Sequence, residues 1–192
     1  MRPLTYLIGV TLDGFIAGPD DEVDFFDLSD DFVDYLGEQW ADTLPSHVRT
    51  ALGVADRPLT RFDTVVMGRR TYDPAATLGI DDPYAHLRTV VCSRTLTARP
   101  ELPVEFTADD PVAVVRRLKA AGSGLGVYLA GGGRLAGQVL DEIDHLVVKT
   151  YPVLAGSGVP VIAGGFGPRR FALDGRRRFG NDCVVAEFHR RR

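Results

Sequence analysis

The chain has 192 residues, of which 45% are hydrophobic and 25% are charged, and its formal net charge is -4. This length and composition predict one globular domain over residues 1–192, and the acidic balance argues against a nucleic-acid binder. No run of about 18 apolar residues is present, which argues against a membrane-spanning helix. Two cysteines and four scattered histidines offer neither a disulfide framework nor metal-ligand spacing, so we expect no metal site and a cytoplasmic location.

The first half of the chain alternates apolar runs with helical patterns. Residues 4–12 are typical of a strand that ends at the turn signal Asp13-Gly14, and an irregular loop follows. Apolar residues at helical spacing predict a helix from Ser29 to about Ala41 and a shorter helix over 45–53. Continuously apolar runs, typical of strands buried on both faces, follow at 63–68, 88–94 and 104–107.

The second half continues this alternation. A helix is predicted over 110–122, with Asp110 as N-cap, Pro111 at the first position and Gly122 as C-cap. The segments predicted next are a strand at 126–130, a helix to about Leu140, a strand at 145–151, a Gly/Pro-rich connection at 152–168 and two antiparallel strands within 170–190. The pattern predicts an α/β domain with a mixed, mostly parallel central sheet, an antiparallel C-terminal edge and helices on both faces.

The segment "YLAGGGRLAG", residues 128–137, places three consecutive glycines between a predicted strand and a predicted helix. Such glycines let a backbone approach a phosphate, and a helix start offers free N–H groups; a tight turn without a ligand explains them equally well. Gly131, Gly133 and Ala136 match the spacing of a dinucleotide fingerprint. However, the next strand ends in Lys149-Thr150 where a Rossmann fold needs an acid, and too few residues remain for the rest of that fold.

Two further strand ends carry hydroxyl and guanidinium groups. One strand leads into the helix start Gly68-Arg69-Arg70-Thr71, and another ends in Ser93-Arg94. Arginines at a helix N-terminus oppose the dipole unless an anion lies there; the alternative is that they are solvated or paired with Asp63 or Asp73. Because ligands of open α/β sheets gather beyond the carboxyl ends of parallel strands, these ends and the glycine loop predict one site for a dinucleotide with a 2′-phosphate.

Four segments, "IGVTLDGFIAG", "MGRRTY", "CSRTL" and "LAGGGRLAG", follow one another along the chain. Together they resemble the dihydrofolate reductase-like superfamily, in particular the branch that contains the reductase domain of the bacterial riboflavin-biosynthesis deaminase-reductase. The motifs occur in family order and at family-like spacing over nearly the whole chain. The resemblance implies a dihydrofolate reductase-like fold and NADPH as the cofactor.

The resemblance also implies which residues hold that cofactor. Those facing its pyrophosphate and adenosine side are Gly68, Arg69, Arg70 and Thr71. Those near the 2′-phosphate are Ser93 and Arg94. Those cradling the pyrophosphate are Gly131, Gly132, Gly133, Arg134 and Leu135. Those bordering the nicotinamide, where small and apolar residues let the ring lie flat, are Gly9, Val10, Ile16 and Ala17.

The implied reaction is hydride transfer to a C=N or C=O carbon of a heterocyclic or sugar substrate, with a protein group donating the proton. A carboxylic acid buried beside the nicotinamide would have a raised pKa and would suit that role. Asp13 matches the riboflavin branch, and Asp24 lies nearer the position of the acid in folate reductases. The alternatives are a turn-forming role for Asp13 and a helix cap for Asp24.

The sequence leaves three hypotheses for the function. The first is an NADPH-dependent reductase similar to 5-amino-6-(5-phosphoribosylamino)uracil reductase, the second a dihydrofolate or other pterin reductase, and the third a non-catalytic NADPH-binding protein. Residues 25–62 carry extra predicted helices that would wall the pocket, and no zinc-binding deaminase domain is expected. A small heterocyclic molecule is the expected partner, and the predicted C-terminal hairpin with its exposed sheet edge predicts a homodimer.

Overall fold

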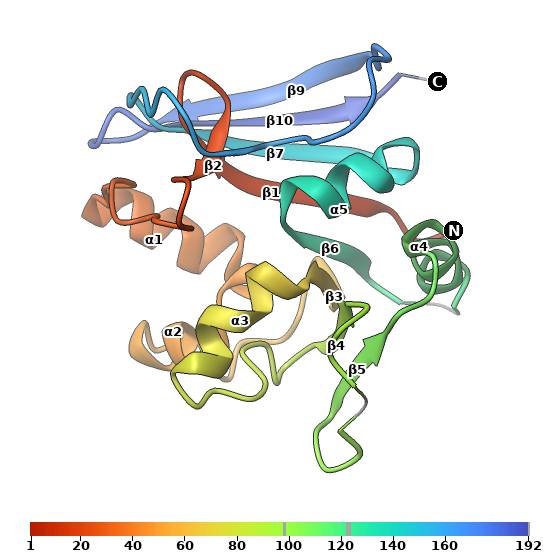
Figure 1. Cartoon of the computed structure of the whole chain (residues 1–192). Helices are drawn as coiled ribbons and strands as arrows, with labels where there is room; N and C mark the ends of the chain where they lie inside the picture. The colour runs from red at the N-terminus through yellow and green to blue at the C-terminus, as the bar shows by residue number, and fades with distance from the viewer. Residues whose placement is uncertain (98, 122–123, 192) are drawn as a thin grey trace.

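The computed structural model of the chain describes residues 1–97, 99–121 and 124–191, and a large central sheet runs through it (Figure 1). The strands of this sheet are β1 (Leu4–Val10), β3 (Phe62–Gly68), β4 (Arg88–Cys92), β5 (Val104–Thr107), β6 (Gly126–Gly131), β7 (His145–Thr150), β9 (Phe171–Arg178) and β10 (Val184–Arg190). The eight strands lie in the order β5-β4-β3-β6-β1-β7-β10-β9. Two short strands, β2 (Phe15–Ala17) and β8 (Val159–Pro160), form a separate ribbon.

Strand direction divides the sheet into two parts. Neighbouring strands from β5 to β7 are parallel, whereas β10 pairs antiparallel with both β7 and β9. The prediction of a mostly parallel sheet with an antiparallel C-terminal edge is therefore confirmed. The central strands read as continuous apolar runs because both of their faces are covered: Val65, Val66 and Met67 of β3 have no exposed surface.

Helices cover both faces of the sheet, which gives three layers (Figure 1). The helices are α1 (Asp30–Gln39), α2 (Ser46–Ala51), α3 (Arg69–Thr77), α4 (Pro111–Ala120) and α5 (Gly133–Gln138), with short 3-10 helices η1 (Ala41–Thr43) and η2 (Leu140–Glu142). α1 and α3 contribute Phe32 and Tyr72 to the core on one face. α4 and α5 contribute Leu118 and Leu135 to the core on the other. The predicted helices on both faces are confirmed.

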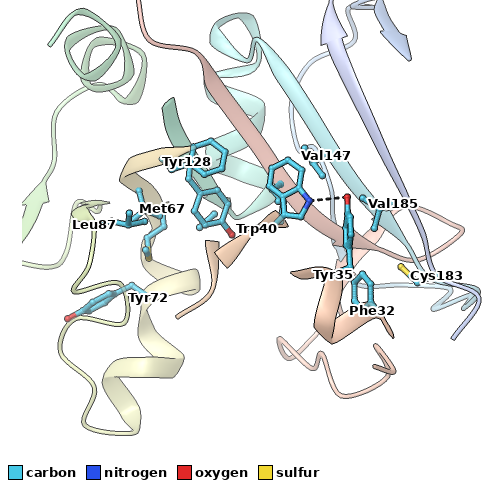
Figure 2. Close-up of a cluster of buried hydrophobic side chains, with 14 of the residues drawn as sticks. Phe32, Tyr35, Trp40, Met67, Tyr72, Leu87, Tyr128, Val147, Cys183 and Val185 are labelled. Atoms are coloured by element: carbon cyan, nitrogen blue, oxygen red, sulfur yellow. Dashed lines mark hydrogen bonds between the residues drawn. The ribbon is translucent and has the colours of Figure 1, made fainter. Parts of the chain in front are cut away.

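The core beneath α1 and α3 is rich in aromatic side chains (Figure 2). The indole of Trp40 donates a hydrogen bond of 3.0 Å to the hydroxyl of Tyr35, and Phe32 packs edge-on against Phe179 with ring centroids 5.0 Å apart. Cys183 and Val185 of the C-terminal strand region lie in the same cluster. A charged side chain on this face of the sheet is therefore an exception that needs a reason.

The helix predicted over 110–122 is α4, and its start follows the sequence signal. The Asp110 carboxylate accepts a hydrogen bond of 3.0 Å from the backbone N–H of Ala113, and Pro111 is the first helical residue. Gly122, predicted as the C-cap, lies outside the described residues. Near the end of the helix, the buried Lys119 places its Nζ 2.7 Å from a carboxylate oxygen of Asp144.

The ribbon of β2 and β8 lies where the sequence analysis expected only an irregular loop and a Gly/Pro-rich connection. Phe15 pairs with Pro160, and the N–H of Val161 donates to the carbonyl of Gly14 at 2.9 Å. Strands of two and three residues are too short to give a period-two pattern. Three predicted strands also end early, at Val10, Cys92 and Thr150, and the helix predicted to Leu140 divides into α5 and η2.

Candidate functional site

The carboxyl ends of neighbouring parallel strands meet at one edge of the sheet. Strand pairing aligns Gly68 of β3 with Cys92 of β4, and Met67 of β3 with Gly131 of β6. β1 lies on the other side of β6 and ends at Val10. The three strand ends that carry the Gly-Arg-Arg-Thr, Ser-Arg and Gly-Gly-Gly-Arg segments therefore lie side by side.

The backbone conformation and the space around a Cβ differ at the three glycines of the loop. Gly131 has a φ of +131°, which L side chains rarely adopt, and a cis peptide bond joins it to Gly132. A Cβ on Gly133 would overlap the carbonyl oxygen of Pro160 and lie 3.2 Å from its carbon. A Cβ on Gly132 would meet, within 4 Å and among the described residues, only the hydroxyl of Thr71 at 3.7 Å. Gly133 therefore permits the close packing of the β8 segment, and Gly132 leaves open space.

Two helices begin beside this loop. Gly68 is the N-cap of α3, and a Cβ built on it would lie 3.9 Å from the Cβ of Leu135 in the first turn of α5. The Thr71 hydroxyl lies 3.4 Å from the position of a Cβ on Gly131. The first turns of both helices carry N–H groups without intrahelical partners and the positive ends of the helix dipoles. This arrangement favours an anionic group beside Gly132.

Arg69 and Arg70 have carboxylate partners in the structure. Arg69 Nε lies 2.9 Å from Asp73 Oδ2, which is one of the pairings that the sequence left open. Asp63, the other carboxylate considered there, forms an ion pair with Arg2 instead. Arg70 makes two hydrogen bonds, of 2.9 and 2.7 Å, to Asp21 in the loop after β2. The side chains of the Arg69 and Arg70 pairs are more than one-third exposed, so each pair contributes only about 0–1 kcal/mol and can exchange its carboxylate for a phosphate.

Arg94 and Arg134 differ from the two paired arginines. Both are exposed, and neither guanidinium has a hydrogen bond or ion pair within the part of the chain that the structure describes. The buried Ser93 hydroxyl accepts hydrogen bonds from the N–H groups of Thr95 (3.2 Å) and Leu96 (3.1 Å). Ser93 thus shapes the turn that presents Arg94, and the two free guanidinium groups are available to a ligand.

The four residues predicted to border a nicotinamide lie on β1 and β2. Gly9 and Val10 end β1, and Ile16 and Ala17 lie on β2, which the turn at 11–14 folds back beside β1. A Cβ on Gly9 would lie 3.3 Å from a ring carbon of Tyr151, so a larger residue there would crowd the ring. These residues form a narrow, mostly apolar wall at the end of β1.

Asp13 has a structural role that the sequence left as the alternative. Its carboxylate accepts hydrogen bonds from the Thr11 hydroxyl (2.6 Å) and from the N–H groups of Ala155 (3.1 Å) and Gly156 (2.6 Å). These bonds, that of Thr11 first, lower the pKa of Asp13 to about 2. The expectation of a raised pKa is therefore wrong for Asp13: an exposed, hydrogen-bonded carboxylate stays ionised at neutral pH and holds no proton to donate.

Asp24 lies in an exposed turn before α1. It is not a helix cap, because Ser29 occupies the N-cap position of α1. Its carboxylate has no hydrogen bond or ion pair to any residue that the structure describes. Two residues further on, Phe26 packs on Tyr151 with ring centroids 4.6 Å apart, so the turn that carries Asp24 lies near the end of β7.

The residue that the sequence reasoning missed is Lys149, which entered it only as the wrong residue for a Rossmann fold. Lys149 lies directly across from Gly9 in the parallel pairing of β7 with β1. Its Cε lies 3.9 Å from the position of a Cβ on Gly9. Burial lowers the pKa of this lysine. A lone lysine in the apolar strand "HLVVKTY" is the signal that could have identified it.

The site is a strand-end surface and does not coincide with a closed cavity. One cavity of about 240 Å³ lies at the opposite ends of the strands, where Thr5, Phe62 and His145 line it together with Trp40. We place the candidate site at the carboxyl ends because the open glycine, the helix starts and the free arginines are there. In the described ranges, no group of three or more His, Cys, Asp or Glu side chains is placed to hold a metal ion.

No helix within the described residues is long and apolar enough to cross a membrane.

The sheet is mostly parallel, and the Gly-Gly-Gly-Arg loop and the Gly-Arg-Arg-Thr helix start lie at the ends of adjacent strands. Together, this strand order and these motifs define a domain of the dihydrofolate reductase-like class. The family model of the RibD C-terminal domain matches residues 2–185. The chain belongs to that family, the riboflavin-biosynthesis reductase branch of the superfamily, and the resemblance inferred from the four motifs is confirmed.

Relatives of known sequence or structure agree with this family. The uncharacterized protein YwjB of Bacillus subtilis (strain 168) is 29% identical over 181 residues, 93% of each chain. A candidate riboflavin biosynthesis protein of Shewanella sp. PV-4 has the same fold, with a TM-score of 0.71, 24% identity and full coverage of both chains. A diaminohydroxyphosphoribosylaminopyrimidine deaminase/5-amino-6-(5-phosphoribosylamino)uracil reductase of Thermotoga maritima has a TM-score of 0.65 and 16% identity; the match covers 99% of this chain and 57% of that one.

A third solved structure has the same fold. The pyrimidine reductase-like protein of Corynebacterium diphtheriae has a TM-score of 0.66 and 13% identity, over 100% of this chain and 92% of that one. At these identities the solved structures show the fold, and their activities do not transfer to this chain directly.

Proposed function

We propose that this chain is an NADPH-dependent reductase that transfers a hydride to a C=N or C=O carbon of a phosphoribosylamino-pyrimidine. One observation carries the proposal: the open position at Gly132 lies between the first turns of two helices, with the Thr71 hydroxyl 3.7 Å from the Cβ position. The relative from Thermotoga maritima, whose described activities include reduction of 5-amino-6-(5-phosphoribosylamino)uracil, supports the class of substrate.

The donor set fits a phosphate-bearing dinucleotide. The Gly131–Leu135 segment and the Gly68–Thr71 helix start would hold the pyrophosphate through backbone N–H groups and the Thr71 hydroxyl. Arg94 follows β4, and Arg134 lies in the first turn of α5. Both side chains are exposed and have unengaged guanidinium groups within the described ranges, the kind of donor that pairs with phosphate in a bidentate way. We assign Arg94 to the 2′-phosphate, which would favour NADPH over NADH.

The chain's own residues would orient the reaction and keep water away from it. When bound, the reduced nicotinamide supplies the hydride. Gly9, Val10, Ile16 and Ala17 would border its ring at the end of β1. Tyr151 closes the same space with its ring 3.3 Å from the Cβ position of Gly9. Asp13 acts as a positioning residue, because its bonds to Ala155 and Gly156 hold the 152–158 segment beside that end of β1.

The substrate pocket would lie on the α1 side of the sheet. The predicted extra helices of residues 25–62 are present as α1, η1 and α2, and Phe32 of α1 packs on Tyr151 with ring centroids 6.0 Å apart. We therefore propose that the loop before α1 and the α1 helix wall the substrate. The proposal includes a cytoplasmic location and a homodimer.

The test is NADPH oxidation by the purified protein with each candidate substrate. We expect turnover with 5-amino-6-(5-phosphoribosylamino)uracil, measured as loss of absorbance at the wavelength of reduced nicotinamide. Turnover with dihydrofolate alone would replace the substrate class by a pterin. Tight NADPH binding without turnover on either compound would instead support the non-catalytic binding protein, and absence of NADPH binding would refute all three.

A further inference from the structure

Lys149 stands on the apolar face of the sheet that carries the aromatic cluster. Side chains on a strand alternate between faces, so Lys149 shares its face with Val147 and Tyr151, both members of that cluster. On the adjacent strand β1 its neighbour is Gly9, and on the adjacent strand β10 its neighbour is Val185. Figure 2 shows Val185 beside Cys183 in the same cluster. The lysine therefore extends over the one strand neighbour that has no side chain.

The amine of Lys149 has no charged partner among the residues that the structure describes. No hydrogen bond or ion pair joins it to any residue in the described ranges. The titratable groups that face it are the thiol of Cys183 and the phenol of Tyr151, and burial raises the pKa of both, so both are neutral at pH 7. Its strand neighbours Gly9 and Val185, and Phe26, which also lies beside Gly9, carry no charge.

The second lysine of the chain shows what a buried lysine of this fold looks like when its role is structural. Lys119 places its Nζ 2.7 Å from Asp144 Oδ2 and 3.8 Å from Glu142 Oε2, and it donates a hydrogen bond of 2.8 Å to the carbonyl of Glu142. A buried ammonium is retained at a low cost only when it is paired in this way. Lys149 is only partly buried, so its unpaired amine stays in contact with solvent and is open to a partner that arrives with a ligand.

We propose that Lys149 is the proton donor of this reductase and that the substrate places the nitrogen or oxygen of its reducible double bond against Lys149 Nζ. This inference rests on the proposed function. As the reduced nicotinamide gives a hydride to the substrate carbon, one Nζ–H bond breaks and an N–H or O–H bond forms on the substrate. The cofactor is oxidised, the substrate gains two electrons and two hydrogens, and the neutral amine regains a proton from water.

The chemistry of the surrounding groups favours Lys149 over Asp13. Asp13 is ionised and engaged in three hydrogen bonds, so it has no proton to give at neutral pH. An ammonium in apolar surroundings releases its proton more readily than one in water, which suits a general acid. Lys149 lies beside Gly9 on β1, and β1 is the strand next to β6, which ends at Gly131. The amine is therefore next to the proposed nicotinamide wall.

The presence of only two lysines allows a direct test. We would label lysine with 13C at Cε and 15N at Nζ, follow both signals by NMR as a function of pH, and assign them with K149M. We expect Lys149 to titrate at lower pH than Lys119, and its signal to shift on addition of NADP⁺ with 5-amino-6-(5-phosphoribosylamino)uracil while that of Lys119 stays in place. A Lys149 signal that ignores this pair of ligands would overturn the proposal.

The kinetics of two variants distinguish a proton-donating role of Lys149 from a role that needs only its positive charge. K149M should lower kcat by at least about 100-fold, the lower end of a general acid's contribution, with NADPH affinity unchanged. K149R keeps the charge but cannot release a proton at accessible pH, so its kcat should fall similarly while the substrate KM stays within a few-fold of wild type. Recovery of kcat in K149R, or more than one-third of wild-type kcat in K149M, would contradict proton donation.

The pH profile gives a further readout, and a failed proposed function has a distinct signature. Wild-type kcat should fall as pH rises through the pKa of Lys149, and this limb should be absent in K149M. Since a methionine removes an unpaired charge from an apolar face, we expect K149M to fold. If the wild-type protein itself does not oxidise NADPH with this substrate, the proposed function fails and the role of Lys149 fails with it.

Discussion

The substitution Gly132→Val separates the ligand-binding role of the glycine loop from its role in folding. A Cβ at Gly132 lies 3.7 Å from the Thr71 hydroxyl, an ordinary van der Waals distance, so the free energy of unfolding should change by less than about 1 kcal/mol. The same side chain would fill the space proposed for the pyrophosphate. The loss of one or two hydrogen bonds to a charged group, each worth about 1.5–3 kcal/mol, predicts a dissociation constant for NADPH at least about 10-fold higher.

The neighbouring glycine provides the matched control. A Cβ in Gly133→Ala would overlap the backbone carbonyl of Pro160, so this variant should lose about 1–3 kcal/mol of stability through overpacking. Gly175→Val, on β9, adds the same side chain as the test variant at a position with no described atom within 4 Å, and should leave both properties unchanged. Calorimetric titration with NADPH and thermal unfolding measure the two effects. A folded Gly132→Val protein that binds NADPH with wild-type affinity would refute the cradle.

Three further predictions follow from single contacts or surfaces. Arg94→Ala should weaken NADPH binding much more than NADH binding in parallel titrations, and equal effects on both would remove Arg94 from the 2′-phosphate. The folded-state pKa of Asp13 is about 2, below its ordinary 3.8, so its stabilising effect is present above about pH 4 and is lost as pH falls through 2. The fall in Tm between pH 5 and pH 2 should therefore be smaller in Asp13→Asn than in wild type, and equal falls would contradict the bonds of Asp13. Because β9 pairs only with β10 in the described sheet, its other edge is free, and sedimentation should give twice the monomer mass of 20.9 kDa; a single species at 20.9 kDa would contradict the homodimer.

The parts of the fold that the sequence predicted are those whose cause is local. β3 and β6 are buried on both faces, so their composition alone identifies them as strands. The N-cap of α4 depends on Asp110 and on the backbone of Ala113, three residues away. The order of the motifs along the chain was enough to identify the family, because each motif follows a strand whose end lies at the same edge of the sheet.

The parts that the sequence could not predict depend on contacts between distant segments. Asp13 bonds to Ala155 and Gly156, which lie 142 and 143 positions further along the chain, and these bonds decide that its pKa falls rather than rises. The ribbon of β2 and β8 joins two segments that each look irregular when considered alone. Similarly, the sequence shows three equivalent glycines, and only the position of Pro160 against Gly133 tells which of them leaves room for a ligand.

Contacts between distant segments also change the interpretation of Lys149, from evidence against a Rossmann fold to the proposed proton donor. Read along the chain, a lysine at the end of the strand after a glycine loop only argues against a ribose-binding acid and thus against a Rossmann fold. In the structure, that strand is β7, and its parallel partner is β1 rather than β6. The lysine is therefore set against Gly9 at the proposed nicotinamide wall, across β1 from the glycine loop. The chemistry of a strand end is decided by the neighbouring strand, and an unpaired amine beside a glycine is evidence for function only once that neighbour is known.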